Sequence, residues 1–151
     1  MIGLAFVIGI VAGLRAMLAP AAISWAAAQR GLALEGSWLA FLGWRFTPWI
    51  LSLLALGELV TDQLPATPSR KVPAQFGARL VTGALSGAAI GIGAGSLLVG
   101  LVLGLVGAVV GTYGGAAVRA QLAKAFGRDT PAALIEDAVA IAAAAWVLLA
   151  L

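Results

Sequence analysis

Long apolar runs separated by short polar intervals limit most strongly what this sequence can fold into. Hydrophobic residues make up 62% of its 151 residues and charged residues 10%, whereas a soluble domain carries about 25% charged residues. So few polar side chains cannot cover the surface of a fold that is surrounded by water. The sequence therefore predicts an all-α, polytopic transmembrane helix bundle, folded as a single domain over residues 1–151.

A helix needs about 20 apolar residues to span the hydrocarbon core of a bilayer, so the runs have room for about five helices. The expected helices cover residues 2–28, 38–62, 76–94, 97–126 and 131–151. Pro20 predicts a kink or break in the first of them. Gly43 and Pro48 interrupt the second, which is either one tilted helix or a short interfacial piece followed by a helix.

The basic residues are distributed unevenly among the polar intervals, and this predicts an orientation. Five crossings would gather most of them on one side, namely Arg70, Lys71, Arg79, Arg119, Lys124 and Arg128. The positive-inside rule then places the N-terminus in the cytoplasm and the C-terminus outside. An even number of crossings in the second run would overturn this orientation.

The sequence has no cysteine and no histidine, which removes several kinds of chemistry. Disulfides, thiol nucleophiles and Cys/His zinc sites are excluded, and no Gly-x-Ser-x-Gly motif marks a serine hydrolase. Glu58 and Asp62 are the one carboxylate pair whose spacing suits an acid–base site. We therefore expect a protein that is not an enzyme, holds no cofactor or metal, and contacts the lipid bilayer but no nucleic acid.

Glycines recur at intervals of three or four residues along two of the expected helices. They are Gly83, Gly87, Gly91, Gly95, Gly100, Gly104, Gly107, Gly111 and Gly115. Residues four apart share a helix face, and glycine there lets two helix backbones approach closely. The spacing predicts that residues 76–94 and 97–126 form an antiparallel hairpin packed along glycine. The alternative is that these faces form a seam between subunits or a sliding surface.

Three charged residues lie where lipid or the bundle interior is expected. Arg15 lies well inside the first apolar run, and an arginine at the bilayer centre costs about 2.5–3.5 kcal/mol on insertion scales. Glu58 and Asp62 are four apart on one helix face and are its natural partners. These three residues form either a structural pairing inside the bundle or a site for an ion, a proton or a substrate.

Further charged and polar residues are candidates for the same site, although simpler explanations exist. Glu136 and Asp137 are expected near a helix N-terminus, where the positive end of the helix dipole stabilises acidic side chains. Arg79 is expected near a cytoplasmic helix end, where its side chain would reach the interface. The loop residues Thr67, Ser69 and Arg70 would flank the cytoplasmic mouth of a site.

Two stretches of eight residues suggest an internal repeat. Residues 12–19 (AGLRAMLA) and 116–123 (AAVRAQLA) are identical at five positions. With five crossings, the two stretches would run in opposite directions, as in the inverted repeats of transporters. Coincidence in a chain so rich in alanine and leucine is the competing explanation.

Several segments resemble one family of bacterial membrane proteins. They are Gly13-Leu-Arg15 with Pro20, the stretch from Gly57 to Arg70 (GELVTDQLPATPSR), Gly77-Ala-Arg79, and the stretch from Glu136 to Ile141. The family is classed as a domain of unknown function, family four-one-two-six, and the resemblance spans almost the whole chain. It implies a small protein of the bacterial inner (cytoplasmic) membrane and implies no particular activity.

Two functions are compatible with these features. The first is a small transporter or channel for an ion or small polar solute, with Arg15, Glu58, Asp62, Arg79 and Glu136 lining a site between helices. The second is a non-catalytic accessory or scaffold subunit that binds a lipid, another apolar ligand, a membrane partner or a second copy of itself. Convergence of Arg15, Glu58 and Glu136 on one hydrated cavity would favour the first, and separate burial of these residues in ion pairs of their own would favour the second.

Overall fold

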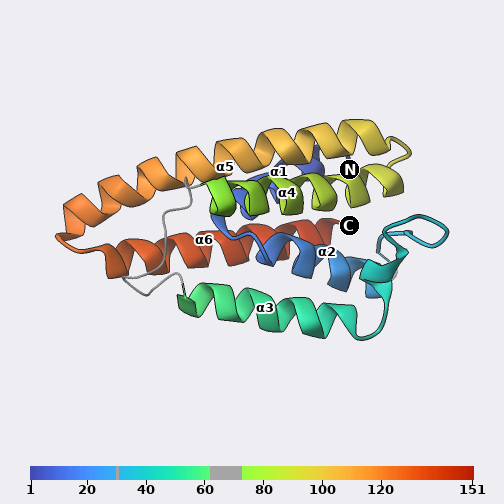
Figure 1. Cartoon of the computed structure of the whole chain (residues 1–151), viewed down its shortest axis with the longest axis horizontal. Helices are drawn as coiled ribbons and strands as arrows, with labels where there is room; N and C mark the ends of the chain where they lie inside the picture. The colour runs from blue at the N-terminus through green and yellow to red at the C-terminus, as the bar shows by residue number, and fades with distance from the viewer. Residues whose placement is uncertain (30, 62–72) are drawn as a thin grey trace.

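The computed structural model describes residues 1–29, 31–61 and 73–151, which form a bundle of six α-helices and one short 3-10 helix (Figure 1). In chain order they are α1 (Gly3–Leu14), α2 (Leu18–Ala28), η1 (Ala40–Gly43), α3 (Thr47–Thr61), α4 (Pro73–Gly93), α5 (Leu97–Phe126) and α6 (Asp129–Ala150). These ranges contain no strand, which confirms the all-α prediction. Four predicted site residues lie outside the described residues: Asp62, Thr67, Ser69 and Arg70.

Three of the helices, α4, α5 and α6, are long and apolar enough to cross a membrane. Their exposed faces carry large apolar side chains, such as Leu98 and Val102 on α5 and Leu149 on α6. Apolar surface that extends along whole helices suits contact with lipid better than contact with water. The length and the surface of these helices indicate a helical membrane protein.

The first apolar run, expected as one helix over residues 2–28, is instead a hairpin of two short helices. Arg15 has an extended backbone (φ −145°, ψ 109°) and ends α1. A Cβ atom built on Gly93 would meet the side chains of both Leu32 and Met1, so the chain beyond α2 returns to the start of α1. Most residues of α1 and α2 are buried, so this hairpin occupies the centre of the bundle.

Pro20 explains why the helix breaks before the proline is reached. In a continuous helix, the proline ring would clash with the carbonyl of Ala16, four residues earlier, and would leave that carbonyl without a hydrogen bond. A break around Ala16 avoids this clash. It also places Pro20 in the first turn of α2, where a backbone N–H has no helical partner in any case.

The remaining elements lie close to their expected positions. The run at residues 38–62 divides into η1 and α3, which is the second of the two alternatives expected for it. α5 has the predicted bounds, while α4 begins at Pro73 instead of residue 76 and α6 at Asp129 instead of residue 131. Such differences of two or three residues are usual at helix ends, where local signals are weakest.

Glycine faces bring α4 and α5 into backbone contact. Cβ atoms built on Gly87 and Gly91 would overlap the backbone of α5 around Gly100. A Cβ on Gly83 would lie 2.9 Å from the carbonyl oxygen of Gly104. The residue numbers therefore rise on one helix as they fall on the other, so α4 and α5 are antiparallel.

The later glycines of α5 have different surroundings. Gly107 and Gly111 face α1, where added Cβ atoms would overlap the backbone at Phe6 and Ile10. Gly95 has a positive φ of 83° and lies in the turn between α4 and α5, a conformation that glycine adopts without strain. Gly115 is only partly buried.

α1 and α5 run in the same direction, which contradicts the predicted inverted repeat. Gly9 lies against Gly104, and Gly13 lies further along against Ala108 and Thr112. The two similar stretches, residues 12–19 and 116–123, therefore begin on parallel helices. The reversal of the chain between α1 and α2 removes the change of direction that an inverted repeat requires.

Both chain termini lie at the same end of the bundle (Figure 1). An odd number of crossings would place them at opposite ends, so the condition on which the predicted orientation of the termini depended is not met. The hairpin of α1 and α2 accounts for the difference, because it returns the chain to the end at which it started.

Candidate functional site

The break between α1 and α2 leaves backbone N–H and C=O groups without the hydrogen bonds that a continuous helix would give them. The last carbonyls of one helix and the first N–H groups of the next have no partner within their own helices. Buried inside a protein, each such group must find a hydrogen bond elsewhere or destabilise the fold. The side chains that bind these groups define the candidate site.

Two arginines bind the carbonyls at the end of α1. The Nη1 group of Arg79, on α4, donates a hydrogen bond to the carbonyl of Gly13 at 2.7 Å. The Nη1 group of Arg15 donates to the carbonyl of Leu14 at 2.7 Å. The Thr112 hydroxyl on α5 is 3.5 Å from the same Gly13 carbonyl. The positive charges thus lie at the negative end of the α1 dipole, where they are stabilised.

A carboxylate from α3 binds the N–H groups at the start of α2. The N–H of Ala16 donates to Oε1 of Glu58 and the N–H of Met17 donates to Oε2, each at 2.7 Å. One side chain therefore occupies the positive end of the α2 dipole with both of its oxygens, in the manner of an anion bound at a helix N-terminus.

Arg15 joins the break to α6. Its Nη1 group lies 2.8 Å from Oε1 of Glu136, and its Nε donates to Oδ1 of Asp137 at 2.7 Å. Its Nη2 group also contacts Asp137. The side chain of Arg15 is 1% exposed and that of Glu136 is 6% exposed. Among the described residues, these two carboxylates balance the charge of Arg15.

Arg79 connects the two halves of the arrangement. Its Nη2 group lies 3.9 Å from Oε1 of Glu58, while its Nη1 group holds the end of α1. Five charged side chains therefore surround the helix break, and we call them the charged network: Arg15, Glu58, Arg79, Glu136 and Asp137. They come from the break itself and from three different helices, α3, α4 and α6.

The structure brings together five of the predicted site residues but pairs them differently from the sequence prediction. Arg15 was expected to pair with Glu58 and Asp62. Among the described residues it pairs with Glu136 and Asp137, while Glu58 binds backbone N–H groups; Asp62 lies outside the described residues. The difference arises because a helix break offers Glu58 stronger local partners than a continuous helix would.

The simpler explanations for Glu136, Asp137 and Arg79 do not hold. α6 begins at Asp129, so Glu136 and Asp137 lie beyond the first turn, to which the dipole effect is limited. The side chain of Arg79 is 3% exposed, so it does not extend to an interface. All three residues instead face the helix break.

Two groups in the site were not expected from the sequence, the carbonyl of Gly13 and the hydroxyl of Thr112. Both depend on the position of the break, which Pro20 indicated only approximately. A proline clashes with the residue four positions before it, and this rule would have located the break at Ala16 and the exposed carbonyls just before it.

Comparison with protein-family models, curated proteins and solved structures finds no match for this chain. The resemblance to a bacterial membrane family therefore stays a prediction. The site is defined by its own geometry as a broken helix in the interior of a helical membrane protein, held by buried and partly buried charges. Among the described residues, no three acidic side chains gather closely enough to hold a metal ion.

Proposed function

We propose that this protein is a small transporter or channel in which the helix break and the charged network form the binding site for an ion. One observation carries the proposal: charged side chains from two other helices, Glu58 on α3 and Arg79 on α4, bind the backbone groups freed by a break in a central helix, and two carboxylates on α6 bind the arginine at the break. Irregular backbone at membrane depth is tolerated where it is buried in protein or lines a polar cavity. Transporters use such discontinuous helices to bind ions and anionic groups near the bilayer midplane.

The depth of the break supports this proposal. α1 has 12 residues, which corresponds to about 18 Å of helix, and the hydrocarbon core is about 30 Å thick. A hairpin of this length enters the membrane and turns back before crossing it. The break would therefore lie within the hydrocarbon region, where charged groups are costly and usually serve a function.

The packing of α3 supports a site that changes its conformation. This helix lies at the edge of the bundle (Figure 1) and packs on α2 and η1. Pro48 and Ala55 are its buried residues. Because α3 carries Glu58, a small displacement of α3 would remove the carboxylate from Ala16 and Met17. An ion could then exchange with Glu58 at the backbone groups of the break.

Transport can be tested in proteoliposomes by solid-supported membrane electrophysiology with concentration steps of sodium, potassium, protons, chloride and phosphate. We expect a current for at least one of these ions, reduced at least about tenfold in Glu58→Gln, since a hydrogen bond to a charged group is worth about 1.5–3 kcal/mol. Asp129→Asn is the matched control, because it makes the same acid-to-amide change at an exposed residue outside the network. Folded wild-type protein that gives no current with any of these ions would refute the proposal.

We also propose an orientation with both termini on the outer face of a bacterial inner membrane. Arg119, Lys124 and Arg128 lie on or just after the second half of α5, at the end of the bundle away from the termini (Figure 1). At the end that holds the termini, the described residues between α2 and α3 include one basic residue, Arg45, and one acidic residue, Glu35, so they carry no net charge. The positive-inside rule then assigns the α5–α6 end to the cytoplasm.

The absence of cysteine from the chain makes this orientation easy to test. Single cysteines at Ala33 and Lys124, both exposed and at opposite ends, can be labelled in intact spheroplasts with a membrane-impermeant maleimide. We expect Ala33→Cys to be labelled directly and Lys124→Cys only after permeabilisation. The reverse pattern would overturn the orientation and leave the transport proposal standing.

The alternative function, a scaffold whose glycine faces bind a partner helix, is less well supported. Three glycines of α4 and two of α5 already face each other, and two further glycines of α5 face α1; these are Gly83, Gly87 and Gly91 against Gly100 and Gly104, and Gly107 and Gly111 against α1. A partner helix could reach these faces only by displacing helices of the same chain. The lipid bilayer is therefore the partner that the described surface favours.

A further inference from the structure

A pocket of about 410 Å³ is lined by the end of α2 and by the segment that follows it. This part of the chain lies at the end of the bundle that holds the termini, away from the break that precedes α2 (Figure 1). Its lining residues are Ala27, Leu32, Leu34, Glu35, Ala40, Phe41, Gly43 and Trp44. The volume lies within the range of about 300–1,000 Å³ that is usual for small-molecule sites. The pocket uses no residue of the charged network, so it is independent of the proposed transport site.

The walls of the pocket are firmly held. Leu32, Leu34, Leu39 and Leu42 anchor the segment between α2 and α3, and each is at most 2% exposed. The hydroxyl of Ser24, on α2, donates a hydrogen bond to the carbonyl of Leu42. A segment fixed in this way can present its remaining side chains without paying to order them when a ligand binds.

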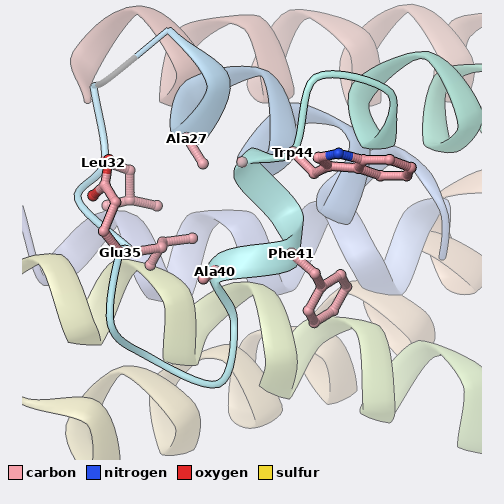
Figure 2. A pocket seen from close by; sticks show the side chains of 8 residues that line it. Ala27, Leu32, Glu35, Ala40, Phe41 and Trp44 are labelled. Carbon is pink, nitrogen blue, oxygen red and sulfur yellow. The ribbon is translucent and has the colours of Figure 1, made fainter.

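The side chains that this segment presents are aromatic or acidic. Phe41 and Trp44 lie on one side of the pocket and Glu35 on the other (Figure 2). Phe41 is 53% exposed and Trp44 is 57% exposed, although both are large apolar side chains. Of the lining residues that the structure describes, Glu35 is the one with a charge, and it forms no ion pair with any described residue.

Three features of the pocket favour a positive charge. The carboxylate of Glu35 attracts a cation directly, and aromatic faces attract cations through their ring quadrupoles. α2 ends at Ala28, and its C-terminal end, where Ala27 lines the pocket, carries the negative end of the helix dipole. The leucine and alanine walls would contact an apolar group attached to that cation.

We propose that this pocket binds an organic ammonium ion with an apolar body, with the ammonium group near Glu35 and the apolar body against Phe41 and Trp44. The test uses purified full-length protein in a nonionic maltoside detergent and two water-soluble probes of similar size, benzyltrimethylammonium and phenylacetate. Binding is followed by calorimetry. We expect benzyltrimethylammonium to bind at least about tenfold more tightly than phenylacetate, because the pocket carries a carboxylate and no described cation among its lining residues.

Matched variants separate a specific site from general attraction to the protein. Glu35→Gln should weaken benzyltrimethylammonium binding about tenfold, as expected for loss of a charged partner, whereas Asp129→Asn at the other end should leave it unchanged. Trp44→Leu should weaken it more than Trp38→Leu, because Trp38 is exposed but does not line the pocket. Equal binding of both probes, or a Glu35→Gln variant with wild-type affinity, would overturn the proposal.

The source of the ammonium group can be identified in nanodiscs. If the natural ligand is a lipid headgroup, benzyltrimethylammonium should bind more weakly in nanodiscs of phosphatidylethanolamine than in nanodiscs of phosphatidylglycerol. Equal affinity in the two kinds of nanodisc would indicate a soluble ammonium ligand. A failure of the transport experiment would leave this result unaffected, since Glu35 and Glu58 lie at different places on the bundle.

Discussion

Residues 12–19 and 116–123 share five of eight residues, yet they have different structures. In the first stretch, the helix stops at Arg15 and starts again at Leu18, and the side chain of Arg15 is 1% exposed. In the second stretch, α5 continues without interruption through Arg119, whose side chain is 18% exposed. Eight similar residues therefore do not decide whether this chain forms a helix or breaks one.

The residue that follows each stretch accounts for much of the difference. Pro20 follows the first and Lys124 follows the second. The proline disfavours a continuous helix at Ala16, whereas lysine is a good helix former. The surroundings then complete the difference, because Glu58 and Arg79 bind the groups freed at the first stretch. The comparison teaches that a buried helix break requires both a cause in the sequence and partners from other helices.

The largest expected effect is the loss of stability when Arg15 is replaced. Arg15→Met leaves Glu136 and Asp137 in the interior without the guanidinium, and breaking a buried ion pair in this way costs about 3–5 kcal/mol. The free energy of unfolding can be measured in mixed micelles by titration with sodium dodecyl sulfate, followed by tryptophan fluorescence. A loss below about 1 kcal/mol would show that these carboxylates do not depend on Arg15.

If Arg15→Met does not fold, a second variant still decides the question. Combining Arg15→Met with Glu136→Gln and Asp137→Asn removes the charges on both sides of the pair. Replacing a whole buried ion pair is often neutral for stability, so the triple variant should recover most of the lost free energy. A triple variant as unstable as Arg15→Met would indicate that Arg15 acts through its contact with the Leu14 carbonyl instead.

Much of the fold could be predicted from the sequence, because apolar runs and glycine spacing are local signals. The bounds of α5 followed directly from the turn at Gly95 and the stop at Gly127. The reversal between α1 and α2 was not predicted, since a proline in an apolar run is compatible with either a kink or a hairpin. Only the packing of the returning α2 against other helices decides between them.

The candidate site could be predicted as a set of residues but not as a set of contacts. Charged residues are conspicuous in an apolar sequence, so Arg15, Glu58, Arg79 and Glu136 were natural candidates. Their partners depend on backbone groups that become available only when a helix breaks. Sequence spacing carries no information about such groups until the break itself has been located.

A smaller loss of stability is expected when Arg119, in the second stretch, is replaced. Arg119 bonds to Asp129 through Nε at 3.0 Å and Nη2 at 2.7 Å, but the side chain of Asp129 is 61% exposed. Exposed ion pairs contribute about 0–1 kcal/mol. Arg119→Met should therefore lower the free energy of unfolding by less than about 1 kcal/mol in the titration used for Arg15→Met, and it should leave any ion current unchanged. If Arg119→Met lost as much stability as Arg15→Met, the two arginines would contribute equally. Neither the exposure of the Arg119–Asp129 pair nor the absence of a helix break at Arg119 would then predict a smaller contribution.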